Sequence, residues 1–284
     1  MGTKTIEQLL PDLEHLIKTK EVSVDDGRKE ELIQEYMDEI EEALRGFLQE
    51  TEREHKNYLR GSNIGQPARK LYYDINGDQK KEELSSKLLL TFLQGHVMEA
   101  VLLLLVELSG HTVEHKQEEV EVEGIKGHID AVIDGVLIDV KTASPYSYQD
   151  KFVKGGILDG RDPFGYNMQN KLYAHAFNMD KWGWLAFNKA SGETHLLLEE
   201  TFINDAPEVI KNKKYLMKQD TPPSRCYPDK ADGKSGNTIL GSDCSYCRHK
   251  VNCWEGLRAF KYSNGVKYFT NVKKTPKVEE LKIS

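Results

Sequence analysis

The stretch from Gly127 to Lys141 constrains the fold more than any other part of the chain. Two apolar runs flank Asp134 and Gly135, which together are a strong signal for a two-residue turn. The pattern predicts a β-hairpin with strands near Lys126–Ile133 and Val136–Thr142. Each strand is bordered by residues that end regular structure, so the hairpin should be a fixed element of the core.

Charged side chains inside this hairpin give the first indication of chemistry. Side chains alternate between the faces of a strand, so Asp139 and Lys141 should point the same way, and Asp130 on the partner strand can converge with them. Two close carboxylates repel each other unless a cation lies between them, and a hard divalent ion such as Mg²⁺ prefers oxygen ligands. The alternative is a pair of ordinary solvated strand residues.

A long apolar helix is predicted upstream, from Leu84 to Ser109. It contains Glu99, and a buried ionised glutamate is costly without a partner. A cation bound at the hairpin would balance the charge of Glu99. Alternatively, Glu99 lies on a solvent-facing stripe of the helix, where water would solvate it. His96, three residues earlier, shares that stripe and is interpreted as a structural histidine.

A second helix is predicted at residues 166–178. Gln169 and Tyr173 are one turn apart on it, so they share a face. An amide and a phenol on one stripe can bind a phosphate or orient a lysine and its water. An ordinary amphipathic helix would carry the same pattern.

Taken in order, these segments resemble the PD-(D/E)xK nuclease superfamily, in particular its RecB-like and phage exonuclease branch. The matching motifs are Gly95-x₃-Glu99, Gly127-x₂-Asp130, Asp139-x-Lys141 and Gln169-x₃-Tyr173. The resemblance implies an α/β fold with a restriction-endonuclease-like core, in which helices flank a mixed central sheet. Many RecB-like members have histidine where Glu99 stands, so this chain is more similar to the lambda-exonuclease type.

The resemblance also implies a function. Glu99, Asp130, Asp139 and the Val140 carbonyl would hold Mg²⁺ or Mn²⁺, Lys141 would activate a water, and Gln169 and Tyr173 would orient the lysine or the strand. The implied activity is that of a DNA exonuclease in recombination, repair or phage DNA processing. A structure- or sequence-specific endonuclease and a non-catalytic DNA-binding scaffold remain as alternatives.

All four cysteines lie late in the chain: Cys226, Cys244, Cys247 and Cys253. A close pair with two further cysteines has the spacing of a metal site. No apolar signal segment opens the sequence, which disfavours disulfides and favours a cytoplasmic location, in a host cell if the protein is encoded by a phage. The resemblance implies a [4Fe–4S] cluster, although Cys226 would replace a cysteine expected before the core. Zn²⁺ is the alternative, with His249 as a reserve ligand.

Charge is unevenly distributed along the chain. The net charge is −7, and residues 1–55 hold 16 acidic and 7 basic residues against 30 and 32 in the remainder. The acidic arm is interpreted as a solvated helical face that could dock a recombination or replication protein. Arg69, Lys151 and Lys154 are predicted to contact DNA phosphates.

The predicted organisation has three parts: an N-terminal helical extension at 1–60, the nuclease core at 61–220, and a cysteine segment with a lysine-rich tail at 221–284. We expect the tail after Gly265 to be poorly ordered. The segment 143–165 is expected to be a mobile, DNA-facing loop, with Tyr148 and Phe152 among its stacking aromatics. No transmembrane span is expected.

Overall fold

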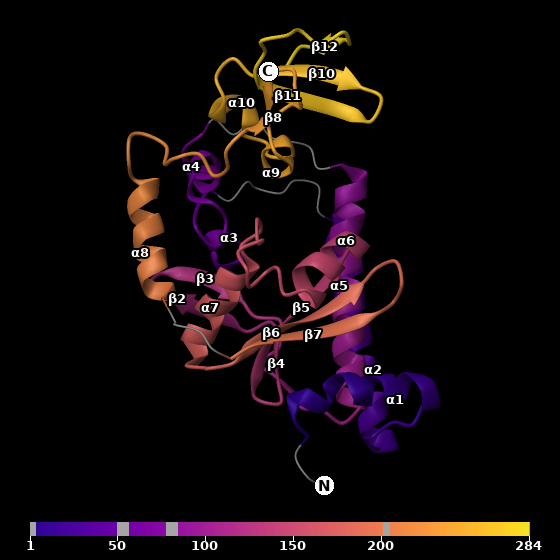
Figure 1. The fold of residues 1–284 in the computed structure, drawn as a ribbon. Helices are drawn as coiled ribbons and strands as arrows, with labels where there is room; N and C mark the ends of the chain where they lie inside the picture. Colours follow the sequence, from indigo (N-terminus) through magenta and orange to yellow (C-terminus); the bar gives the residue numbers. More distant parts are fainter. Residues whose placement is uncertain (1–3, 50–56, 78–84, 201–204, 284) are drawn as a thin grey trace. The chain divides into compact units, whose positions relative to one another are not determined.

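The computed structural model describes residues 4–49, 57–77, 85–200 and 205–283 (Figure 1). These residues form two compact units. Unit 1 comprises Met1–Gly65 and Lys80–Lys211, and unit 2 comprises Gln66–Gln79 and Asn212–Ser284. Each unit has its own sheet, so each is treated by itself.

A five-stranded mixed sheet is the centre of unit 1. Its strand order is β1-β4-β5-β6-β7; β5 and β6 are parallel, and the other neighbours are antiparallel. The strands are β1 Val113–Glu114, β4 Ala131–Ile133, β5 Val136–Ala143, β6 Trp182–Asn188 and β7 Thr194–Glu199. A mixed sheet flanked by helices is the coarse architecture expected from the sequence.

The hairpin predicted from the turn signal is present. Ile133 pairs with Val136, and both turn residues have left-handed backbones, with φ of 48° at Asp134 and 79° at Gly135. Positive φ at both positions is the requirement of a type I′ turn, whose twist matches that of the strands. The turn therefore sets the register that places Asp139 and Lys141.

One predicted strand, Lys126–Ile133, is broken by a bend into β3 Ile125–His128 and β4, and β3 pairs with β2 Glu119–Val122 in a separate two-stranded sheet. A similar bend separates β1 from β2, where His115 and Gln117 have positive φ. Asp130 lies at the first bend and Gln117 at the second.

Helices cover both faces of the sheet. Val136, Ile138 and Val140 of β5 pack on one face with η1, α1, α2 and α5, while Leu137 and Ala143 face the other side with α3, η2 and α7. Figure 1 shows α5 and α7 on either side of β5. The helices are η1 Ile6–Gln8, α1 Leu9–Thr19, α2 Asp26–Gln49, α3 Gly61–Ile64, α5 Ser86–Leu108, α6 Pro145–Ser147, η2 Tyr148–Val153 and α7 Tyr166–Phe177. The predicted start of α5 at Leu84 lies outside the described residues.

The N-terminal helices are part of the core of unit 1 and not an extension of it. Leu9, Leu32 and Tyr36 are buried in the same cluster as Ile138 and Val140. Their apolar stripe covers a sheet face that would otherwise be wet. The acidic residues that suggested a separate arm occupy the outer face of the same helices.

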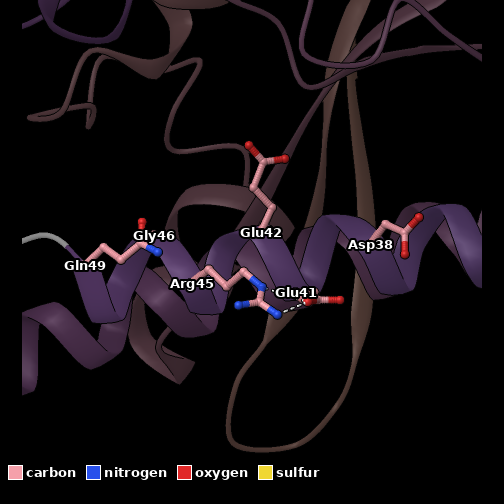
Figure 2. Close-up of a pocket in the computed structure, with 6 residues that line it drawn as sticks. All are labelled: Asp38, Glu41, Glu42, Arg45, Gly46 and Gln49. Carbon is pink, nitrogen blue, oxygen red and sulfur yellow. Dashed lines mark hydrogen bonds and ion pairs between the residues drawn. The ribbon is translucent and has the colours of Figure 1, made fainter.

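A shallow hollow of about 440 Å³ lies along that outer face of α2 (Figure 2). Arg45 pairs there with Glu41. The lining residues are Asp38, Glu41, Glu42, Arg45, Gly46 and Gln49. Half of these residues are acidic, as expected for a solvated helix face, and none of them is a predicted site residue.

The segment 143–165 is helical in part, so the expectation of a mobile loop is wrong. It forms α6 and η2, and Tyr148 and Phe152 are buried in the core between the sheet and α7. Burial of these rings under the sheet fixes the segment. Neither ring is available to stack on a base.

Unit 2 joins α4 Ala68–Asn76 and the end of α8 Ala206–Met217 to the cysteine-bearing segment. Its sheet has the order β12-β10-β11-β9-β8. The strands are β8 Lys230–Ala231, β9 Thr238–Ile239, β10 Arg258–Tyr262, β11 Gly265–Asn271 and β12 Glu280–Leu281, and two short helices, α9 Ser242–Ser245 and α10 Lys250–Cys253, carry cysteines. The expectation of a poorly ordered tail is wrong, because the tail forms β11 and β12 and Phe269 is buried. The predicted boundaries at 60 and 220 are displaced to 65 and 211, and 66–79 belongs to unit 2.

Within the described residues, only α5 has the length and apolar composition of a membrane-crossing helix. Core helices of soluble proteins have the same length and composition. The C-terminal half of α5 contributes Leu102, Leu103 and Val106 to the core of unit 1, so length and composition alone do not make α5 a membrane span.

The packing of α1 into the core gives a stability prediction. Leu9 is 0% exposed and Leu48 of α2 is 79% exposed. We expect Leu9→Ala to lower the free energy of unfolding by about 2–5 kcal/mol, because it leaves a cavity under the sheet. The matched control Leu48→Ala should change it by no more than about 0.5 kcal/mol. Urea denaturation measures both, and equal effects would show that the N-terminal helices do not stabilise the sheet.

Candidate active site

Lys141 lies between the two carboxylates of the hairpin. Its Nζ is 2.6 Å from Asp139 Oδ1, 3.8 Å from Asp130 Oδ2 and 3.5 Å from the Val140 carbonyl oxygen. The structure thus brings together all four groups that the sequence placed around the hairpin. A lysine ammonium occupies the position between the carboxylates where a cation was expected.

The end of β4 fixes Asp130 in this position. The β4–β5 ladder extends only as far as the pair Ala131–Ile138, so the Val140 N–H has no strand partner on that side. Asp130 Oδ2 accepts a hydrogen bond from this N–H at 2.7 Å. The side chain thereby replaces the missing ladder bond and is held against β5.

Asp139 is the most deeply buried carboxylate of the site, with 3% of its surface exposed. Burial raises the pKa of Asp139 to about 7; Lys141 opposes the shift and the charge of Asp130 adds to it. Its Oδ2 is buried with no hydrogen-bond partner. An unsatisfied carboxylate oxygen in the interior is costly, so it marks a position where a ligand would be stabilised.

Glu99 reaches the site from α5. Burial, followed by the charge of Asp130, raises the pKa of Glu99 to about 8. Its Oε1 accepts a hydrogen bond of 2.6 Å from Gln117 Nε2. Glu99 is therefore a partly buried member of the carboxylate cluster, while His96 on the same helix is exposed.

Lys141 remains charged in this environment. Burial alone would lower its pKa, but Asp139 and Asp130 outweigh burial and raise it. The ring of Tyr166, the first residue of α7, lies 5.3 Å from Nζ. The lysine is thus held by carboxylates on one side and by an aromatic ring on another.

Gln169 and Tyr173 of α7 complete the buried polar groups of the site. Gln169 Nε2 donates to the Tyr173 hydroxyl at 3.3 Å, and burial followed by the charge of Asp139 raises the pKa of Tyr173. A Cβ at Gly127 would lie 2.6 Å from the Tyr173 hydroxyl, and one at Gly61 would lie 2.8 Å from it. The two glycines therefore make the space that this ring needs.

Sequence reasoning missed two residues of this arrangement, Gln117 and Tyr166. Gln117 lies in the bend between β1 and β2, where only its positive φ distinguishes it. Tyr166 follows Gly165 at the start of α7, and an aromatic residue at a helix start is an ordinary pattern. No local pattern in the sequence could have connected either residue with Asp139.

The donor set fits a hard divalent cation. The described residues contain no group of three His, Cys, Asp or Glu side chains already arranged around one point, and the Lys141 ammonium lies between two of the carboxylates. The unsatisfied Asp139 oxygen and the raised pKa of Glu99 nevertheless indicate an excess of buried negative charge. Oxygen ligands and excess negative charge are what Mg²⁺ or Mn²⁺ requires.

The four cysteines lie in unit 2 as free, partly buried thiols. Burial, followed by the charges of Cys247, Cys253 and Cys226, raises the pKa of Cys244 to about 11. Three thiols therefore act electrostatically on Cys244. Among the described residues no three His, Cys, Asp or Glu side chains are arranged to hold a metal ion, so a shared cysteine centre and the nature of its metal stay predictions.

The three predicted phosphate contacts occupy different environments. Arg69 Nε donates to Cys253 Sγ at 3.1 Å, and the same guanidinium donates to the Pro223 carbonyl and the Tyr73 hydroxyl within unit 2. In unit 1, Lys154 is exposed and Lys151 is 8% exposed. Their contact with DNA stays a prediction.

Comparisons with known proteins give only distant structural similarity. No protein-family model and no curated protein matches the sequence. Among solved structures, the chain is similar to SSO0001 (TM-score 0.40, 16% identity, 78% of this chain and 96% of the other). It is also similar to a phage-related exonuclease from Haemophilus somnus 129PT, with a TM-score of 0.39 and 15% identity over 58% of this chain and 93% of the other. A third similar structure is the alkaline exonuclease LHK-Exo from Laribacter hongkongensis, with a TM-score of 0.40 and 10% identity over 58% of this chain and 89% of the other. At TM-scores near 0.4 these similarities decide neither fold nor function, so the side chains of the site must carry the assignment.

The raised pKa values predict how stability depends on pH. Asp139 and Glu99 titrate near 7 and 8 in the folded protein, against ordinary values of 3.8 and 4.5. Below about pH 4 both carboxyl groups are protonated in the folded and in the unfolded protein, so they do not affect the free energy of unfolding. Above about pH 4 the unfolded protein loses these protons first, because the folded protein binds them more tightly. The free energy of unfolding therefore falls as pH rises to about 8. We expect the free energy of unfolding in EDTA to decrease across this range.

Asp139→Asn provides the matched comparison, because it removes the buried charge and keeps the shape. Between about pH 4 and pH 8 the free energy of unfolding should decrease in both proteins. The decrease in the variant should be smaller than that in the native protein by about 1 kcal/mol or more. Urea denaturation at several pH values measures the two slopes. Parallel slopes would mean that Asp139 does not carry a raised pKa in the folded state.

Proposed function

We propose that the protein is a metal-dependent nuclease that hydrolyses phosphodiester bonds of DNA, most simply as an exonuclease. One observation carries the proposal. The buried Asp139 carboxylate, with one oxygen unsatisfied, lies beside Asp130, Glu99 and a buried lysine ammonium. Oxygen ligands for a divalent cation next to a lysine ammonium suit a reaction in which water attacks the phosphorus of a phosphodiester.

The chain would hold the cation through Glu99, Asp130, Asp139 and the Val140 carbonyl. A bound Mg²⁺ or Mn²⁺ supplies electrostatic stabilisation of charge on the phosphate and on the leaving oxygen. With the carboxylates directed to the cation, the Lys141 ammonium is released to orient the attacking water. Its positive charge favours loss of a proton from that water.

The residues of α7 would position the substrate and the lysine. The Tyr173 hydroxyl and the Gln169 amide are fixed by burial and by their mutual hydrogen bond. Fixed donors of this kind pay little entropy on binding a phosphate oxygen. The ring of Tyr166, 5.3 Å from the Lys141 ammonium, would help to hold this lysine in place.

The cellular role belongs to the same proposal. An exonuclease of this kind would serve in DNA recombination, repair or phage DNA processing in the cytoplasm, with the acidic outer face of α2 as a surface for a protein partner. A structure- or sequence-specific endonuclease would cut a closed circle, whereas an exonuclease requires an end. A DNA-binding scaffold would cut neither.

The activity is tested with end-labelled linear DNA and with a covalently closed circle, in Mg²⁺ and in EDTA. We expect Mg²⁺-dependent release of nucleotides from the linear strand only. Asp139→Asn should reduce the rate at least about a hundredfold and Lys141→Ala by a similar factor, because each removes a group that acts on the reacting atoms. The exposed α2 variant Asp38→Asn is the acid-to-amide control and should retain full activity.

Lys141→Ala distinguishes its role in the reaction from a role in binding. Affinity for the labelled strand in EDTA should change much less than the rate, because the lysine acts on water. Undiminished cleavage by purified, folded Asp139→Asn would exclude this site as the catalytic centre. Cleavage of the closed circle would favour the endonuclease instead.

We further propose that Cys226, Cys244, Cys247 and Cys253 hold one structural metal centre, either a [4Fe–4S] cluster or Zn²⁺. The electrostatic coupling of Cys244 to the other three thiols supports a shared site. Thiolates favour these metals over Mg²⁺, and four protein ligands leave no open position. The Arg69 hydrogen bond to Cys253 would stabilise a thiolate there.

Anaerobic purification tests this centre. A brown protein with visible absorption, iron and sulfide indicates the cluster, and a colourless protein with about one zinc per chain indicates Zn²⁺. Cys247→Ser should abolish metal retention and lower the thermal midpoint. Serine substitution of a residue outside the four, Ala231→Ser, is the control. Metal-free protein with four reactive thiols and unchanged stability would contradict the proposal.

A further inference from the structure

A pair of aromatic rings borders the candidate active site. The rings of Phe164 and Tyr166 are nearly parallel, with an angle of 24° between them and centroids 5.5 Å apart. Tyr166 lies beside the Lys141 ammonium, at 5.3 Å. Phe164 is 48% exposed, although a phenylalanine in a packed loop would normally be buried. An apolar ring is thus presented to solvent two residues before a ring that lies beside Lys141.

Lys151 spans both rings. Its Nζ is 4.1 Å from the Phe164 centroid and 5.7 Å from the Tyr166 centroid, distances comparable with the 5.5 Å between the rings. An ammonium on the outer face of a face-to-face stack would be much farther from the second ring than from the first. The two rings therefore form an offset stack, and Lys151 lies beside this stack, near both rings and not beyond its outer end.

We propose that Phe164 stacks on a nucleobase of the strand held at the active site, so that the site takes a strand with unpaired bases. The inference rests on the proposed nuclease function and assigns the substrate form to it. Every base has a π-face, so an exposed ring held by a neighbouring ring and a lysine binds bases without regard to sequence. A base in a closed duplex is stacked on its neighbours and cannot use the ring.

The geometry relates this stacking position to the chemistry. The ring of Tyr166 lies near the ammonium groups of both Lys141 and Lys151. The stacked pair of rings is therefore next to the lysine of the proposed reaction and to a second positive charge. One nucleotide placed with its base on Phe164 has its phosphates within the field of both lysines. Phe164 is therefore a positioning residue, which fixes the strand and leaves the reaction to Lys141 and the carboxylates.

Binding in EDTA tests the inference without hydrolysis. The probes are a fluorescein-labelled thymidine oligonucleotide of about 12 nucleotides, the same backbone lacking all bases, and a blunt-ended DNA duplex with all of its bases paired. We expect Phe164→Ala to weaken binding of the thymidine strand about tenfold or more. Binding of the abasic strand and of the duplex should be unchanged within about twofold, because neither probe offers a free base.

Three further variants separate stacking from other effects. Phe164→Trp should restore affinity for the thymidine strand, and Phe164→Leu, which keeps an apolar side chain without a π-face, should not. Tyr215→Ala removes an aromatic ring of α8 that is 62% exposed and should change no affinity. Circular dichroism checks that each variant is folded, and the half-exposed position of Phe164 makes unfolding a minor concern.

The outcomes distinguish this inference from the proposed function. Equal loss of affinity for the thymidine and abasic strands in Phe164→Ala, or no loss for either, would overturn the stacking role. Base-dependent binding that is lost in Phe164→Ala would support it even if the protein releases no nucleotides in Mg²⁺. In that case the nuclease proposal fails and the single-strand site remains.

Discussion

The contact of the Lys141 ammonium with Asp139 and Asp130 is the interaction on which the candidate site depends. It neutralises two carboxylates at the edge of a buried sheet face, where unpaired charge would destabilise the fold. The compensation is incomplete, because one oxygen of Asp139 is unsatisfied and the pKa of Glu99 is raised to about 8. The same arrangement therefore balances only part of the carboxylate charge in the metal-free protein and leaves the negative charge that a divalent cation requires.

Backbone features with no chemistry of their own hold this arrangement in place. The type I′ turn sets the hairpin register, and the short β4 leaves the Val140 N–H for Asp130. The small residues Gly61 and Gly127 make space for Tyr173 against the same region. Helices on both sheet faces then bury the hairpin, since α1, α2 and α5 cover the face of Val140 and α7 covers the face of Asp139.

Much of the secondary structure follows from local sequence. The helix predicted at residues 166–178 is observed as α7, and the hairpin turn lies where Asp134 and Gly135 indicated. The predicted carboxylates and lysine also lie together, because strand alternation places Asp139 and Lys141 on one face. The predictions failed where tertiary packing decides the outcome. Tyr148 and Phe152 have an exposed-loop composition around them but are buried, and the acidic helix α2 uses its other side to cover the sheet.

Local sequence predicted the hairpin turn, the shared face of Asp139 and Lys141, and the helix that carries Gln169 and Tyr173, because turn chemistry, strand alternation and helical spacing depend on neighbours in the chain. Only the tertiary structure shows that Lys141 lies between the carboxylates and that Gln117 bonds to Glu99. It also placed Arg69 beside Cys253, 184 residues away, and stacked the ring of Phe164 against that of Tyr166. These contacts join residues from separate elements, and their distances follow from how helices and strands pack rather than from any local pattern.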